Sequence, residues 1–200
     1  KGGGVHFERA GEMGQPWKVS VFLGGPAALT LAAIVPLPEG LDERLLAALM
    51  MGRPLDVIRR DSGHRIPATA EFVLEGTVTP GDVQKEGPFG DHLGHYSHSA
   101  GFPVFRVDRV LARSDAIYPA TVVGKPPQED YYIGEAIQEM TMPLLRMTRP
   151  AVTDLWAYPE TGFHPLAVAA VRQRYRRETL KHALGVLGEG QLSLTKVLIV

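Results

Sequence analysis

Glycine and proline interrupt this chain along its whole length, with 22 glycines and 16 prolines among 200 residues. Together these residue types make up roughly 12% of an average protein, and their share here is clearly higher. Proline breaks the hydrogen bonding inside a helix, and glycine inside a helix or strand costs conformational entropy. The sequence therefore predicts short helices and strands joined by many turns.

The longest uncharged run, residues 19–38, shows how glycine and proline limit the length of a helix or strand. Its length would suit a helix that crosses a membrane. However, Gly24-Gly25-Pro26 divides the run in the middle, and two prolines close it. We therefore expect two short buried elements instead, a strand over 18–23 and a helix over 27–34.

The pattern of predicted elements changes near residues 125–130, which contain two adjacent prolines. The elements predicted before this segment include a helix over 41–51, strands over 72–78, 103–112 and 116–123, and a glycine-rich loop over 79–94. Those predicted after it are a helix over 131–146 broken near Pro143, strands over 152–158 and 166–171, a helix over 173–187 and a strand over 194–200. Short strands with turns are typical of a barrel, and alternating helices and strands are typical of an α/β layer. We therefore expect one domain over 1–130 and a second over 131–200.

Charge and cysteine content exclude several classes of function. The chain has 21 Lys and Arg against 22 Asp and Glu, which gives a net charge of -1 and argues against a strongly basic nucleic-acid-binding protein. It has no cysteine, which excludes a disulfide scaffold, a cysteine nucleophile and a zinc–thiolate site within this chain. The lack of cysteine also fits a reducing compartment. We expect a cytoplasmic protein, with peripheral contact to a membrane as a variant of that expectation.

The loop around residues 86–96 contains the residues most suited to chemistry. It holds two carboxylates, Glu86 and Asp91, among several glycines. Two carboxylates held close together can have widely separated pKa values, so that one stays protonated and can donate a proton. On this pattern alone, a solvated turn is the favoured alternative. His92, His95 and His98 are spaced by three and would share a metal only on a helix, which the glycines argue against.

Three other groups of charged residues have a structural and a functional interpretation. Glu43 lies early in the helix over 41–51, where a carboxylate ordinarily complements the helix dipole and less often binds a metal. Glu71 and Glu75 alternate along a strand, which favours a solvated face. The basic residues of the helix over 173–187 are interpreted as solvated charges partnered by Glu178, with contact to anionic lipid as the alternative.

Several motifs at consistent spacing resemble one family of enzymes. The segment Glu86-Gly87-Pro88-Phe89-Gly90-Asp91-His92 resembles the most distinctive motif of the UbiD-like decarboxylases, which use prenylated FMN. The similarity runs through essentially the whole chain. Further matching segments are residues 23–27, 36–38, 66–76, 102–105, 115–118 and 124–129.

The resemblance implies a fold and an activity. The implied fold is α+β, with a split β-barrel like that of flavin reductases followed by part of an α/β domain. The implied activity is the reversible, non-oxidative decarboxylation of an aromatic or α,β-unsaturated acid, here in quinone biosynthesis. The implied cofactors are prenylated FMN, a divalent metal such as Mn²⁺, and K⁺.

The resemblance also implies roles for individual residues. Asp91 matches the family's proton donor, and Glu86 matches the acid that hydrogen-bonds a catalytic arginine. Glu43 matches a carboxylate that binds the metal, which replaces the structural interpretation given above. The positions that match cofactor-binding residues are Lys1, Gly2, Val35 and Pro36.

The family's remaining site residues have no counterpart in these 200 residues. An Asn metal ligand, the catalytic Arg and most cofactor contacts precede the position equivalent to Lys1. We therefore expect an interior piece of a longer enzyme that is inactive alone. Its expected partners are a flavin prenyltransferase that supplies the cofactor and further copies of the same protein, and none is a nucleic acid. The alternative is a non-catalytic, flavin-barrel-like domain that serves binding or assembly.

Overall fold

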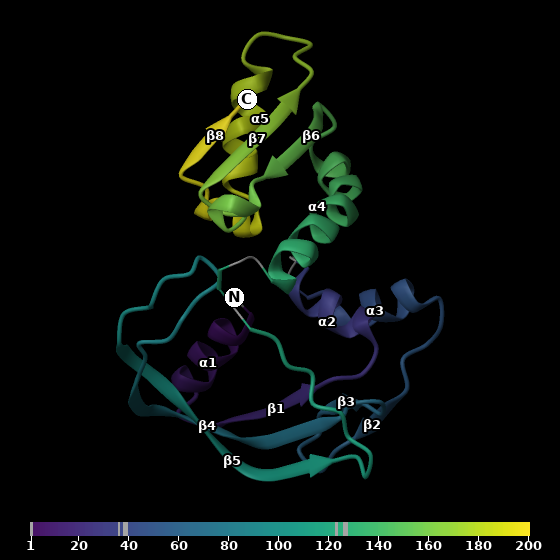
Figure 1. The fold of residues 1–200 in the computed structure, drawn as a ribbon, viewed down its shortest axis with the longest axis vertical. Helices are drawn as coiled ribbons and strands as arrows, with labels where there is room; N and C mark the ends of the chain where they lie inside the picture. The colour runs from purple at the N-terminus through teal and green to yellow at the C-terminus, as the bar shows by residue number, and fades with distance from the viewer. Residues whose placement is uncertain (1, 36, 38–39, 123, 126–127) are drawn as a thin grey trace. The chain divides into compact units, whose positions relative to one another are not determined.

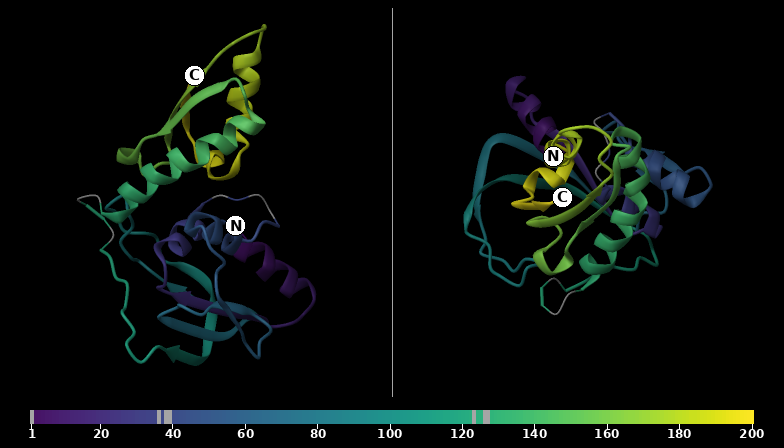
Figure 2. Two further views of the ribbon diagram at one scale, coloured as in Figure 1. Left: turned by 90° about the vertical axis from the view of Figure 1, so that its right-hand side faces the viewer. Right: turned by 90° about the horizontal axis from the view of Figure 1, so that it is seen from above.

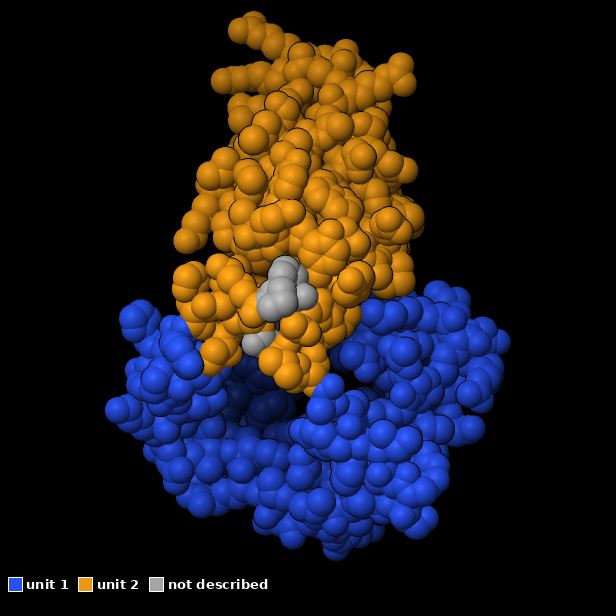
Figure 3. Space-filling model, viewed as in Figure 1, with its two compact units in different colours: residues 1–89, 96–120 blue, residues 90–95, 121–200 orange. Residues whose placement is uncertain are grey.

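A computed structural model describes residues 2–35, 37, 40–122, 124–125 and 128–200. The chain forms two compact units, which are coloured separately in Figure 3. Unit 1 consists of residues 1–89 and 96–120, and unit 2 of residues 90–95 and 121–200. Helices and open sheets occur in both, which confirms the mixed α+β class predicted from the sequence. The domain boundary expected at residue 130 stays a prediction.

Unit 1 is built on a three-stranded antiparallel sheet with the order β1-β4-β5 (Figure 1). Its elements are α1 (Gly2–Glu12), β1 (Trp17–Leu23), α2 (Ala27–Ile34), α3 (Glu43–Met51), β2 (Val57–Arg59), β3 (Arg65–Pro67), β4 (Phe72–Glu86) and β5 (Ala100–Ala112). Strands β2 and β3 form a separate antiparallel hairpin. Buried Val73 on β4 packs with Ile66 and Ala70, so the core lies between the sheet and the hairpin.

Helices α2 and α3 confirm the prediction of short elements. They pack together around Leu29, Ala32 and Ala47, all of which are buried. Helix α3 begins at an Asp42 cap, whose carboxylate accepts a hydrogen bond from the Arg44 N–H at 2.9 Å. It ends at Gly52 in the left-handed conformation. Across the described residues, no helix has the length and apolar character needed to cross a membrane.

Two predictions for the segments around β4 and β5 are wrong. Residues 79–86 are not loop, because β4 resumes its pairing with β5 after an irregularity between Val78 and Val83 and continues to Glu86. Residues 116–122 do not form a strand. There the backbone N–H of Ile117 donates to the Glu71 carboxylate at 3.2 Å, so a side chain takes the place of a neighbouring strand.

Unit 2 consists of a small mixed sheet with the order β6-β7-β8 and the helices beside it. Its elements are α4 (Glu129–Thr148), β6 (Val152–Ala157), the 3-10 helix η1 (Pro159–Thr161), β7 (Leu166–Val171), α5 (Glu178–Leu187), the 3-10 helix η2 (Gly190–Leu194) and β8 (Val197–Ile199). β6 and β7 are antiparallel, whereas β7 and β8 are parallel. Helix α4 packs against β6, and α5 packs against β7 (Figure 2).

The two helices of unit 2 differ in detail from their predicted limits. The prediction of a break near Pro143 is wrong, since helix α4 continues through this residue. The proline leaves the Glu139 carbonyl without its helical donor, and both residues are exposed, so water can supply the missing hydrogen bond. Helix α5 begins at Glu178 rather than at residue 173, because residues 173–177 are not helical and Arg177, which precedes the helix, is in the left-handed conformation.

Candidate functional site

Asp91 lies in a tight turn that belongs to unit 2. Its N–H donates to the His95 carbonyl at 3.0 Å, and its own carbonyl accepts from the Gly94 N–H at 3.0 Å. The carboxylate oxygen Oδ1 accepts hydrogen bonds from the backbone N–H groups of Leu93 at 2.9 Å and His95 at 3.4 Å. The turn therefore fixes the orientation of this half-buried carboxylate through the backbone around it.

The base of this loop is closed within unit 1. The Phe89 N–H donates to Ser97 Oγ at 3.1 Å, and the Ser97 N–H donates to the Phe89 carbonyl at 2.8 Å. Glu86 is the last residue of β4, is paired in register with Ala100 and is exposed. The two candidate acids thus belong to different units, Glu86 to unit 1 and Asp91 to unit 2.

The histidines of the loop also divide between the units. His92 and His95 belong to unit 2, whereas His98 belongs to unit 1. His92 lies near His164, whose pKa is lowered by burial and, to a smaller extent, by the nearby His92. Among the residues that the structure describes, no group of three or more His, Asp or Glu side chains could hold a metal.

The candidate cofactor and metal residues gather around the connection between α2 and α3. Val35 ends α2 and is buried, with its N–H donating to the Leu31 carbonyl and its carbonyl accepting from the Leu37 N–H. Glu43 opens α3, and its side chain is exposed. Its neighbour Asp42 already serves as the helix cap.

The remaining cofactor-binding candidates lie apart from that connection in the sequence. Gly2 is the first residue of α1. Lys1 and Pro36 lie outside the described residues.

Glu71 and Glu75 do not form the solvated face that the sequence predicts. Both side chains are mostly buried, at 17% and 13% exposure. Glu75 accepts two hydrogen bonds from Arg60, at 3.0 and 3.1 Å, and these hydrogen bonds lower the pKa of its carboxyl group. Glu71 pairs with Arg113 at 3.5 Å. The sequence contains no local signal for these distant arginine partners.

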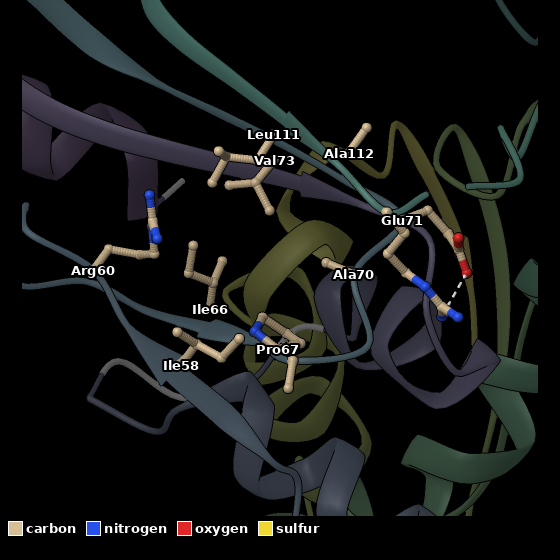
Figure 4. Close-up of a pocket in the computed structure, with 11 residues that line it drawn as sticks. Ile58, Arg60, Ile66, Pro67, Ala70, Glu71, Val73, Leu111 and Ala112 are labelled. Atoms are coloured by element: carbon tan, nitrogen blue, oxygen red, sulfur yellow. Dashed lines mark ion pairs between the residues drawn. The ribbon is translucent and has the colours of Figure 1, made fainter. Parts of the chain in front are cut away.

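A cavity of about 170 Å³ adjoins these ion pairs in unit 1 (Figure 4). Its apolar lining includes Ile66, Val73 and Leu111, and Arg60 and Arg113 lie at its edge. Both guanidinium groups are already paired with glutamates, so their charges are neutralised. The rest of the cavity lining is mostly apolar.

Two models of one family match consecutive parts of the chain. Residues 1–126 match the Rift-related domain of 3-octaprenyl-4-hydroxybenzoate carboxy-lyase. Residues 131–200 match the C-terminal domain of the same enzyme. Together these matches cover nearly all of the chain, on both sides of residues 127–130.

Among known proteins, the chain is 50% identical to a 4-hydroxybenzoate decarboxylase subunit from Chlamydia pneumoniae. That match covers 100% of this chain and 34% of the relative, so the chain spans about a third of the length of the curated relatives it matches.

Solved structures of two other enzymes share the fold. An evolved dimeric form of the UbiD-class enzyme HmfF from Pelotomaculum thermopropionicum, in complex with prFMN, matches with a TM-score of 0.80 and 25% identity, over 96% of this chain and 44% of that one. The closed form of vanillic acid decarboxylase from Sedimentibacter hydroxybenzoicus matches with a TM-score of 0.89 and 24% identity, over 98% of this chain and 42% of that one. The motifs, the two family models and the shared fold together establish that the chain belongs to the UbiD family of carboxy-lyases.

Proposed function

We propose that this chain contributes to a prenylated-FMN-dependent enzyme that reversibly decarboxylates a hydroxylated aromatic acid without oxidation. Membership of the carboxy-lyase family supports the reaction class. The prFMN complex of HmfF supports the cofactor. The relative from Chlamydia pneumoniae is named as part of a 4-hydroxybenzoate decarboxylase, which supports a hydroxylated aromatic substrate. An acid of this kind would be a precursor in quinone biosynthesis.

The hydrogen-bonded turn at Asp91 is the observation that carries the proposal. In decarboxylation the bond between the substrate carbon and its carboxylate breaks, CO₂ leaves, and the electron pair left on the carbon takes up a proton. Prenylated FMN, when bound, supplies the electron sink for that charge. The Asp91 carboxyl group supplies the proton. Its turn keeps the acid in one orientation before the reaction begins, which reduces the entropic cost of the transfer.

Glu86 is proposed as the second acid of the pair. At the end of β4 its carboxylate is exposed. It can accept hydrogen bonds from an arginine and from a donor group of the substrate. Such an acid would keep the arginine oriented toward the substrate carboxylate.

Glu43 and the residues near Val35 are proposed to hold the metal and the cofactor. A carboxylate is a suitable ligand for a hard divalent cation such as Mn²⁺, and the capping role of Asp42 leaves Glu43 available for it. The Val35 backbone, with Pro36, Lys1 and Gly2, would contact the cofactor or K⁺. A flavin prenyltransferase would supply the cofactor, and the enzyme would act as a homo-oligomer.

The replacement Asp91→Asn in the full-length protein tests the proposed acid. Asparagine keeps the shape of the turn but cannot donate the proton, so we expect kcat to fall by at least about 10²-fold. The measurement is CO₂ release from 4-hydroxybenzoate by protein co-produced with a flavin prenyltransferase. The absorbance of the bound flavin should be unchanged.

The matched control is Asp108→Asn, which removes an exposed carboxylate from β5. It should leave turnover intact. Full activity of the Asp91→Asn protein would exclude Asp91 as the proton donor. A folded full-length protein that carries no flavin would favour the non-catalytic alternative.

A further inference from the structure

The corner that follows η1 lies against the Asp91 loop. Gly162 is buried and left-handed, with φ of 72°. A methyl group at this position would lie 2.5 Å from Leu93 Cδ2 and 2.9 Å from His92 Nε2. Non-bonded heavy atoms attract best at about 3.5–4.0 Å, so a side chain at residue 162 would have to push the Leu93 and His92 side chains aside.

The same corner is held in place from the other side by α4. Phe163 is also left-handed, with φ of 62°, which is uncommon for a residue other than glycine. Its ring ends on Gly134 of α4, where a methyl group would lie 2.4 Å from Phe163 Cζ. The Phe163 ring therefore packs on α4, directly after the glycine that contacts the loop.

A second contact holds the far end of the loop. A methyl group at Gly94 would lie 2.8 Å from Lys125 Cγ, so the aliphatic part of Lys125 covers this glycine. Residues 90–95 thus contact the rest of unit 2 at two places, Gly162 and Lys125. These contacts agree with the assignment of the loop to unit 2.

We infer that Gly162 is a positioning residue for the Asp91 carboxylate. The link is Leu93, whose side chain packs on Gly162 and whose N–H donates to Asp91 Oδ1 at 2.9 Å. A side chain at residue 162 would push the Leu93 side chain, and a shift of the Leu93 backbone with it would move the N–H that holds the carboxylate. The inference rests on the proposed role of Asp91 for its effect on turnover, but the effect on the loop can be measured separately.

The test compares Gly162→Ala with Gly52→Ala in the full-length protein. Both glycines are left-handed helix caps, with φ of 72° and 65°, so both replacements bring similar backbone strain. A methyl group at Gly52 meets nothing within 4 Å, whereas one at Gly162 meets the loop. The difference between the two variants therefore isolates the contact with Leu93 and His92.

Hydrogen exchange of the Leu93 and His95 amides is the first readout. We expect exchange at least about ten-fold faster in Gly162→Ala and unchanged in Gly52→Ala, because only the first variant opens the turn. Leu93→Ala, which removes the packed side chain without adding atoms, should also speed exchange. The double variant should be no worse than Gly162→Ala, because both changes remove the same contact. Equal exchange in the two glycine variants would overturn the inference.

The kinetic parameters are the second readout. Displacing the acid should lower kcat by about ten-fold or more while KM and the flavin spectrum stay unchanged. Faster exchange with unchanged kcat would support the contact and contradict the proposed role of Asp91. Slow exchange with normal kcat in Gly162→Ala would contradict the positioning role itself.

Discussion

At the scale of single residues, Glu178 is a buried carboxylate whose hydrogen bonds come from Arg174. Its side chain is fully buried at the start of α5. It accepts a hydrogen bond from the Arg174 backbone N–H at 2.6 Å and another from Arg174 Nε at 3.0 Å. The hydrogen bonds from the Arg174 side chain lower the pKa of Glu178 from 4.5 to about 2. The sequence interpretation paired Glu178 with the basic residues around it, but it did not foresee that the carboxylate is buried.

This pair predicts a pH dependence of stability. Because the folded state lowers the pKa of Glu178, the pair stabilises the protein above pH 4.5, and that contribution is lost as the pH falls toward about 2. Arg174→Met should lower the free energy of unfolding at pH 7 and flatten its decline between these two values. Urea unfolding of unit 2 across this pH range measures both effects. Arg176→Met, at an exposed position, should leave the curve unchanged, and a parallel curve for Arg174→Met would contradict the prediction.

At the scale of elements, close packing decides whether a glycine in a helix can be replaced. Gly134 lies within α4 under the ring of Phe163, whereas Gly11 lies within α1 with nothing within 4 Å of its missing side chain. Intrinsic propensity favours alanine over glycine in a helix by about 1 kcal/mol. Inserting a methyl group into a packed contact costs about 1–3 kcal/mol. A replacement by alanine at Gly11 therefore tests helix propensity alone, whereas the same replacement at Gly134 also tests the cost of the packed contact.

We therefore expect opposite outcomes for the same replacement at these two glycines. Gly11→Ala should raise the free energy of unfolding by roughly 0.5–1 kcal/mol. Gly134→Ala should lower it by about 1–3 kcal/mol, because the ring of Phe163 must move away from α4. Thermal or urea unfolding of the full-length variants measures both values. A stabilising effect at Gly134 would show that the corner after η1 yields easily, and it would weaken the positioning role of Gly162.

At the scale of the whole molecule, the loop over residues 90–95 belongs to unit 2, although its place in the sequence suggests unit 1. The chain on either side of residues 90–95 belongs to unit 1, but the loop itself belongs to unit 2. The contacts that hold it come from residues 125 and 162, which lie far along the chain. The place of residues 90–95 in the sequence therefore does not determine the unit to which they belong.

Metal binding gives a test at this same scale. A ligand that binds only the native state must stabilise it, by about 2.7 kcal/mol when its concentration is 100 times its Kd. We expect Mn²⁺ to raise the melting temperature of the full-length protein, and Glu43→Gln to reduce this rise. Glu12→Gln, a matched change at an exposed acid of α1, should preserve it. An equal rise in all three proteins would exclude Glu43 as a ligand.

Local signals in the sequence account for much of the fold. The Asp42 cap and the Gly52 stop define α3, and Gly24-Gly25-Pro26 separates β1 from α2, as expected. These signals succeed because caps and turns depend on residues within a few positions of one another. The extension of β4 to Glu86 was missed, because its pairing with β5 depends on a strand that lies further along the chain.

The family, the identity of the candidate acids and the short elements between breaks all follow from the sequence alone, because motifs, caps and turns are written in neighbouring residues. The folded chain was needed to establish which unit holds Asp91, which arginines pair with Glu71 and Glu75, and which side chains pack on Gly162. Each of these features is a contact between residues far apart in the chain. Such contacts exist only once the elements have packed, so no local pattern of residues can specify them.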